Sequence, residues 1–150
     1  RQTDLQRLSA PYLSFAFRLK PDHFDGWHQF FPDFSSGQGA APYRTPKDYA
    51  DGLSRIYGFV VWLDAARVRL GEGAAQGVVH PRFVAERMIV QFDTLAGQGA
   101  DSSPFFGPVR QMPTDWPDAQ REAITRDYRA ALDDRLRPAF ARMRNFLRDD

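Results

Sequence analysis

The sequence contains no cysteine, only two lysines and only three glutamates in 150 residues. The absence of cysteine excludes disulfides, thiolate metal ligands and a cysteine nucleophile, but it assigns no cellular compartment. Arginine and aspartate carry the charge instead, with 18 Arg and 16 Asp. Lysine and glutamate are good helix formers and aspartate is a poor one, so folding does not explain this skew. We interpret it as a GC-rich coding bias, and hence as a sign of a bacterial source.

The chain also lacks a clear excess of charge of either sign and a long apolar run. Lys and Arg total 20 and Asp and Glu total 19, a net charge of +1. Proteins that cover nucleic-acid phosphates carry a basic excess, so we predict no nucleic-acid partner. The longest uncharged apolar run, Ile56–Leu63, has 8 residues. Since about 20 residues are needed to cross a bilayer, we predict no membrane span in this chain.

The hydrophobic content of 43% and the aromatic content of 14% are typical of a folded chain. A chain of this length can bury enough surface for one core, so we predict a single domain over residues 1–150. The sequence begins at Arg1 and contains no basic-then-apolar signal segment. We therefore expect a processed chain or a piece of a longer protein.

Apolar residues recur at spacings of three and four in stretches separated by turn residues, which indicates amphipathic helices. We expect helices at about 4–19, within 21–34, from 46 toward 77, at 81–95 and at 117–147. Loops are expected near 35–44 and 97–113, the second held to the core by Phe105 and Phe106. Val78–Val79 is the only short strand candidate. These patterns predict an all-α fold, a bundle-like array of about five or six helices.

Several residues predict where helices begin, end or change direction. Thr45, Pro46 and Asp48 have the spacing of an N-cap, a first-turn proline and a capping box. Gly77 is the expected terminator of the same helix, and Gly58 is expected to divide it in two. Pro138 removes the hydrogen bond to the carbonyl four residues earlier, so we expect it to bend the last helix.

No catalytic or metal site can be assembled from these residues. The three histidines are His23, His28 and His80, and no His-Glu-x-x-His motif is present. No serine lies in a Gly-x-Ser-x-Gly elbow. The glycines at 71–77 follow a helix and lack the Lys-Ser/Thr ending of a phosphate loop. We therefore predict no cofactor, no metal and no catalytic residue within this chain.

Aromatic side chains crowd one short stretch, Phe24, Trp27, Phe30, Phe31 and Phe34. Three interpretations remain open for this cluster: part of the core, a surface that docks on missing parts of a longer protein, or a ligand-stacking platform. The arginines of residues 135–148 could form a basic end, but neighbouring aspartates nearly cancel their charge.

Four blocks resemble a large bacterial family known as domain of unknown function 885. Thr45–Tyr49 followed by Leu53–Ile56 is similar to its Thr-Pro-x-Asp-Tyr … Arg-Leu signature. Leu70–Pro81 is similar to its Gly-x-x-x-Gly-x-x-x-Pro segment. The remaining similar blocks are Ser103–Phe105, and Arg137–Phe140 with Phe146–Leu147. The resemblance covers about residues 44–148, and one departure is Val60, where members tend to have proline.

The resemblance implies a mainly helical part of a longer protein. Family members are chains of several hundred residues, often exported or lipid-anchored, and related to zinc metallopeptidases. Their zinc ligands lie downstream of the blocks seen here. The resemblance thus implies an amino-terminal-half fragment without zinc ligands, from a parent protein that could bind zinc and that is periplasmic or associated with the cell envelope.

The leading hypothesis is a non-catalytic helical portion of a metallopeptidase-like protein that walls a substrate cleft. Its partners would be the remainder of the parent chain and a peptide substrate. The candidates for cleft-facing groups are Tyr49, Arg55, Tyr57 and His80. Arg55 could hold a peptide carboxylate or make a structural salt bridge.

The alternative is a stand-alone helical module that binds a protein or small ligand without enzymatic activity. Large exposed apolar patches, or self-association through them, would favour the first hypothesis. A self-contained hydrolase would need a site that the residues do not supply.

Overall fold

The computed structural model describes residues 27–38 and 41–149, with side chains from Phe30 onward. The described part is helical and contains no strand, which confirms the all-α prediction and removes Val78–Val79 as a strand candidate. The helix predicted at 4–19 lies outside the described residues.

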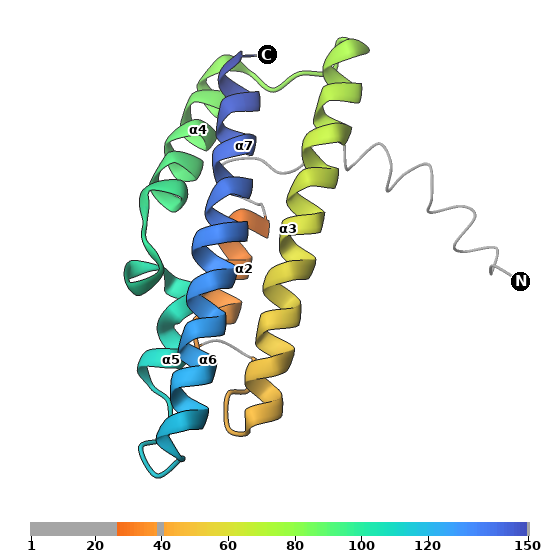
Figure 1. Ribbon diagram of the computed structural model, residues 1–150. Coiled ribbons are helices and arrows are strands. Elements are labelled where there is room, and N and C mark those ends of the chain that lie inside the picture. The colour runs from red at the N-terminus through yellow and green to blue at the C-terminus, as the bar shows by residue number, and fades with distance from the viewer. Residues whose placement is uncertain (1–26, 39–40, 150) are drawn as a thin grey trace, which may run out of the picture.

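The long helices run side by side (Figure 1). Their bounds are α2 Trp27–Ser35, α3 Pro46–Ala75, α4 Arg82–Gly97, α6 Asp118–Ala131 and α7 Arg137–Asp149. A π-helical turn, η3 (Leu132–Leu136), joins α6 to α7 in one rod. This rod runs in the same direction as α3, and α4 packs against α7 in the opposite direction.

The start of α3 follows from the residues that cap it. Thr45 is the N-cap, and its hydroxyl accepts a hydrogen bond from the backbone N–H of Asp48 at 3.3 Å. The carboxylate of Asp48 accepts in return from the backbone N–H groups of Thr45 and Arg44, each at 2.8 Å. The predicted capping box is therefore confirmed, and it satisfies backbone donors that the helix itself leaves unpaired.

The end of α3 is also as predicted. Gly77 has a φ of 77°, in the left-handed region. The N–H of Val78 donates to the carbonyl of Gly73, and that of Gly77 to Ala74, both at 2.9 Å. This is a Schellman motif, in which a glycine turns the chain at no steric cost.

The expected break at Gly58 is wrong, because α3 continues without interruption for 30 residues. A glycine within a helix costs only about 1 kcal/mol relative to alanine. The buried side chains of Ile56, Phe59 and Leu63 on the same two turns outweigh that cost. Val60, unlike proline, also keeps the N–H that the helix needs.

The loop predicted at 97–113 is the second prediction to correct, because these residues are not simply a loop. They form three short helical segments, η1 (Ala100–Ser102), η2 (Pro104–Phe106) and α5 (Gly107–Arg110). Phe105 and Phe106 are 1% and 4% exposed, so the two predicted anchors are confirmed. Their burial keeps this connection against the core.

The sequence predicts a bend at Pro138. The structure has a π-helical segment instead, which lies just before the proline. The N–H of Arg137 donates to the carbonyl of Leu132, five residues back instead of four. The carboxylate of Asp133, inside this turn, accepts from the Ala100 N–H at 3.2 Å and from Arg137 Nη1 at 2.8 Å. A π turn often marks a place where a helix makes a special contact, here with the segment after α4.

Aromatic rings form the centre of the core. Phe31 of α2 stacks on Phe59 of α3, with ring centroids 4.3 Å apart. Phe140 of α7 packs against Phe59 and against Phe92 of α4, at 6.1 Å in each case. Phe105 lies 5.6 Å from Phe31 and closes the cluster. One cluster thus holds α2, α3, α4 and α7 together.

Candidate functional site

Tyrosines gather where α3 begins and lies close to α5 and α6. The hydroxyl of Tyr49 donates to the carbonyl of Pro108 at 3.0 Å, and the hydroxyl of Tyr128 donates to the carbonyl of Tyr49 at 2.9 Å. The ring of Tyr49 also packs edge-on against Tyr43 and Trp116. Tyr49 is 1% exposed. Its contacts therefore join the first turn of α3 to α5 and α6, which favours a structural role.

Burial changes the acidity of two of these tyrosines. It raises the pKa of Tyr128 far above its usual range, and it raises the pKa of Tyr49 as well. Both phenols are neutral at physiological pH, as tyrosines ordinarily are, and burial strengthens that preference. They can orient a neighbour by hydrogen bonding, but they cannot act as bases there.

Arg55 lies beside this tyrosine cluster, between two aromatic rings. Its guanidinium carbon is 6.0 Å from the ring centroid of Phe34 and 5.7 Å from that of Tyr43. Its Nε and Nη2 atoms are buried and have no hydrogen-bond partner in the described structure. The hydroxyl of Ser35, the last residue of α2, is buried and unpartnered in the same way. No salt bridge to Arg55 exists among the described residues, so the structural alternative named for it is not observed.

The aromatic residues before α3 have different roles. Phe31 is core, whereas Phe34 stacks on Phe31 and lies over Arg55. Phe30 is 55% exposed and stacks on Phe34 at 5.8 Å. Phe24 and the side chain of Trp27 lie outside the described residues.

Tyr57 and His80 do not share a concavity with Arg55. Tyr57 is 46% exposed on the outer face of α3. His80 follows the far end of α3, and the rise of an α-helix puts residues 55 and 75 about 30 Å apart. The imidazole borders a small apolar pocket of about 120 Å³ with Leu70 and Phe146, and its Nε2 has no partner in the described structure. The four candidates thus lie in three places.

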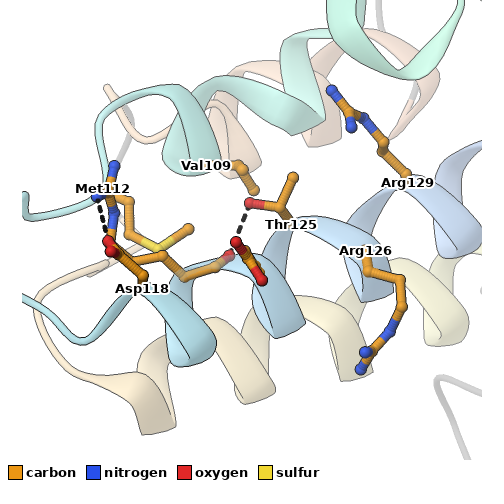
Figure 2. A pocket seen from close by; sticks show the side chains of 8 residues that line it. Val109, Met112, Asp118, Thr125, Arg126 and Arg129 are labelled. Atoms are coloured by element: carbon orange, nitrogen blue, oxygen red, sulfur yellow. Dashed lines mark hydrogen bonds and ion pairs between the residues drawn. The ribbon is translucent and has the colours of Figure 1, made fainter.

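The sequence did not indicate a larger hollow along α6 (Figure 2). It measures about 540 Å³, within the range of small-ligand sites. Residues of its wall include Val109, Met112, Asp118, Arg121, Glu122 and Thr125. The spacing of three and four among the α6 members is the only pattern that could have revealed it.

The charges in this hollow largely balance one another. Arg121 Nη1 lies 3.5 Å from the carboxylate of Asp118, while Arg121 Nε is buried without a partner in the described structure. Arg129 pairs with Asp101 at 2.8 Å, and Arg126 pairs with Asp127 at 2.9 Å. The hollow therefore suits a polar ligand without a strong net charge better than a polyanion.

A third hollow, about 290 Å³ in volume, adjoins the tyrosine cluster. Tyr43, Tyr49 and Pro108 contribute to its wall. Tyr43 therefore lies between this hollow and the guanidinium of Arg55, and it contacts both. Its hydroxyl donates to the carbonyl of Ser35 at 3.4 Å, a long and weak hydrogen bond.

The arginine-rich last helix pairs with the helices beside it. Arg142 binds both carboxylate oxygens of Asp64 on α3, at 3.0 and 2.7 Å, and Arg144 binds Asp93 on α4 at 2.8 Å. Aspartates of other helices thus neutralise these arginines, besides the neighbouring aspartates of the same stretch.

Among residues 27–38 and 41–149, no three His, Asp or Glu side chains come together in a way that could hold a metal ion. Within the same residues, no helix has the length and apolar character that a membrane span requires.

A comparison with protein-family models tests whether the chain belongs to the family that it resembles. The family model described as "Bacterial protein of unknown function (DUF885)" matches residues 2–150. The chain belongs to this family. Neither the curated proteins nor the solved structures include a match to it. Membership in the DUF885 family agrees with the blocks around Thr45–Tyr49 and Leu70–Pro81, which are the cap and the terminator of α3.

Proposed function

We propose that this DUF885 chain is the non-catalytic helical portion of a larger, metallopeptidase-like bacterial protein of the cell envelope. It walls one side of a peptide-binding cleft and supports the half of the protein that holds zinc. The zinc ligands belong to residues outside this chain. Membership in the family supports the bacterial origin, and the outer surface of α3 supports the dependence on further protein.

The single observation that carries the proposal is an uncharged stripe on the exposed side of α3. Seven exposed residues at spacings of three and four form it: Ala50, Ser54, Tyr57, Gly58, Val61, Ala65 and Val68. Val61 is 70% exposed and Val68 is 52% exposed. A rise of 1.5 Å per residue makes the stripe about 27 Å long. A helix with water on this side would carry charged or polar residues there.

The position of α3 explains what the stripe could contact. In Figure 1, α3 forms one edge of the array, and its inner side packs on α6 and α7. Charged side chains border the stripe, with Lys47 at its start and Asp51 and Asp64 at its sides. An apolar strip with a charged border is typical of a protein interface. We assign it to the remainder of the parent chain, with Tyr57 at its centre.

The test uses the full-length gene product and this chain in parallel. We expect the full-length protein to hydrolyse peptides in a zinc-dependent manner, with activity lost on chelation and restored by zinc. The double variant Val61→Arg/Val68→Arg should lower that activity and the thermal midpoint of the full-length protein. In the 150-residue chain the same variant should leave the midpoint nearly unchanged, because both side chains are exposed there.

The matched control is Val90→Arg, on the exposed side of α4, where the valine is 65% exposed. It should affect neither protein. A full-length product without zinc-dependent hydrolysis, or stoichiometric zinc in the 150-residue chain, would contradict the proposal. Equal tolerance of the α3 and α4 variants in the full-length protein would remove the interface.

The hollow along α6 favours the alternative, a stand-alone helical binding module. It is large enough for a small ligand and is complete within the described residues. In that case the 150-residue chain would be monodisperse and would bind its ligand unaided. The variant Thr125→Trp would fill the hollow and abolish that binding, whereas the α3 variants would leave it unchanged.

A further inference from the structure

The Nε–Nη2 edge of an arginine is a fork of parallel N–H groups that matches a carboxylate. Other arginines of this chain use it in that way. In Arg142 the two atoms bind the two oxygens of Asp64, and in Arg129 both bind one oxygen of Asp101, at 3.3 and 2.8 Å. Arg126 does the same with Asp127. With Arg144, whose two atoms bind the amide oxygen of Asn145, an occupied fork is present four times in the described structure.

The same edge of Arg55 is buried, and no acceptor from the described residues reaches it. The aromatic rings of Phe34 and Tyr43 hold the guanidinium in place but cannot accept two in-plane hydrogen bonds. Buried N–H groups left without an acceptor are costly, so the fork has a reason to take one from outside.

The acidic residues described near Arg55 do not fill it. Asp33, next to Phe34 on α2, is exposed, whereas the fork of Arg55 is buried and no hydrogen bond joins the two. Asp48 and Asp51, on the nearby turns of α3, are already bound by backbone N–H groups and by Lys47.

We propose that Arg55 binds a carboxylate group of another molecule, held flat between Phe34 and Tyr43. The carboxylate accepts from Nε and Nη2, and the unpartnered hydroxyl of Ser35 donates the third hydrogen bond. Entry requires Tyr43 to turn into the adjoining 290 Å³ hollow, which breaks its 3.4 Å contact to Ser35 and its edge-on packing against Tyr49. The chemical class is a peptide or amino-acid carboxylate.

This inference deepens the proposed function, because a peptidase cleft presents such carboxylates, but it does not depend on zinc or on further protein. Its test therefore uses the 150-residue chain. The observable is the ¹⁵N–¹H signal of Arg55 Nε, which moves when the fork gains an acceptor. The probes are N-acetylalanine, which carries a main-chain carboxylate, and the α-amide of N-acetylaspartate, which carries only a side-chain one. N-acetylalaninamide has no carboxylate, and phosphate is a general anion.

We expect a saturable shift of the Arg55 signal with one or both carboxylate probes, and none with the amide. The probe that binds more tightly distinguishes a chain terminus from an acidic side chain as the source. Arg55→Lys lacks the Nε signal, so its binding is followed through the backbone amide signals of Ser35 and Tyr43. It keeps the charge but loses the fork, so it should weaken binding about tenfold. Ser35→Ala should weaken it by a smaller factor. Tyr43→Ala removes the covering ring and also one of the two flanking rings, so it should make association faster without tightening binding. Arg142→Lys is the matched control, since its fork is filled by Asp64, and it should bind as the unchanged chain does.

Three results would overturn the proposal. The Arg55 signal could fail to respond to either carboxylate, or phosphate could bind at least as tightly as both. Arg55→Lys could also bind the probes as well as Arg142→Lys does. If Arg55→Lys lowered stability without any probe binding, Arg55 would be a structural clamp between α2 and α3. The proposed zinc-dependent hydrolysis would survive each of these outcomes, so the two failures are distinguishable.

Discussion

Single hydroxyl groups connect segments of this chain that are far apart in the sequence. Tyr128, fully buried on α6, reaches the backbone of Tyr49 across 79 positions, and Tyr49 reaches Pro108 across 59. Gly52 makes this possible, because a side-chain carbon there would overlap the hydroxyl of Tyr128 and the ring of Tyr43. The start of α3 is therefore positioned by side-chain hydrogen bonds as well as by its cap.

Tyr128→Phe tests the strength of this connection. The variant removes one buried hydrogen bond and keeps the ring, so we expect the free energy of unfolding to fall by about 1–2 kcal/mol. Urea denaturation followed by circular dichroism measures the change. Tyr57→Phe, at an exposed position, should stay within about 0.5 kcal/mol. An equal effect of the two variants would mean that the buried hydroxyl contributes nothing special.

The same tyrosines predict how stability depends on pH. Burial raises the pKa values of Tyr49 and Tyr128 above the ordinary value of about 10, so the folded chain holds these protons more tightly than the unfolded chain. Their contribution is complete below about pH 10 and is lost as the pH rises further, because the unfolded chain then ionises first. Urea midpoints between pH 8 and 11 should fall above pH 10, and Tyr128→Phe should reduce that slope by roughly half. A flat profile would contradict the assignment.

Among the elements, α3 depends on the contrast between two glycines. Gly58 lies within the helix, and a side-chain carbon there would meet nothing within 4 Å. Gly77 turns the chain at a φ of 77° with open space around it. Steric room is thus the same at both positions, and only the backbone conformation differs.

Gly58→Ala and Gly77→Ala should therefore change stability in opposite directions. The first replaces a helix breaker with the best helix former and should stabilise the chain by about 0.5–1 kcal/mol. The second forces a left-handed conformation on alanine and should destabilise the chain by about 1–2 kcal/mol. Thermal unfolding of the two variants gives both signs in one experiment. Destabilisation by Gly58→Ala would show that α3 bends there in solution.

For the molecule as a whole, the aromatic core is the common support of α2, α3, α4 and α7. Phe140, 2% exposed, lies 6.1 Å from Phe59 and from Phe92, on the two neighbouring helices. Because α2 and η2 reach the same rings through Phe31 and Phe105, the described elements share one core.

Phe140→Ala should consequently destabilise the whole described structure and not only α7. We expect a loss of about 3–5 kcal/mol from the cavity that it creates. Hydrogen exchange should accelerate together in α3, α4 and α7, since all three lose the same contact. Val90→Ala, on the exposed side of α4, is the control and should change stability by less than about 0.5 kcal/mol. Faster exchange confined to α7 would indicate independent helices.

Local chemistry made much of the fold predictable from the sequence. The cap at Thr45, the terminator at Gly77, the apolar spacing of the helices and the anchors Phe105 and Phe106 each depend on neighbours within a turn or on hydrophobicity alone. Gly58 was misjudged because its local cost is small and the packing that outweighs it comes from distant helices. The short helical turns of residues 97–113 were missed for a similar reason, since contacts with α2 and α6 hold them.

The sequence by itself determined an all-α chain of balanced charge, the ends of its longest helix and its place in the DUF885 family. These properties depend on composition and on short-range spacing. Only the tertiary structure decided that Tyr49 is a buried connector, that Tyr57 and His80 lie apart, and that no described residue fills the fork of Arg55. Whether a hydrogen-bond donor finds an acceptor depends on which segments of the chain meet around it. That meeting arises from packing between residues dozens of positions apart, which no local pattern records.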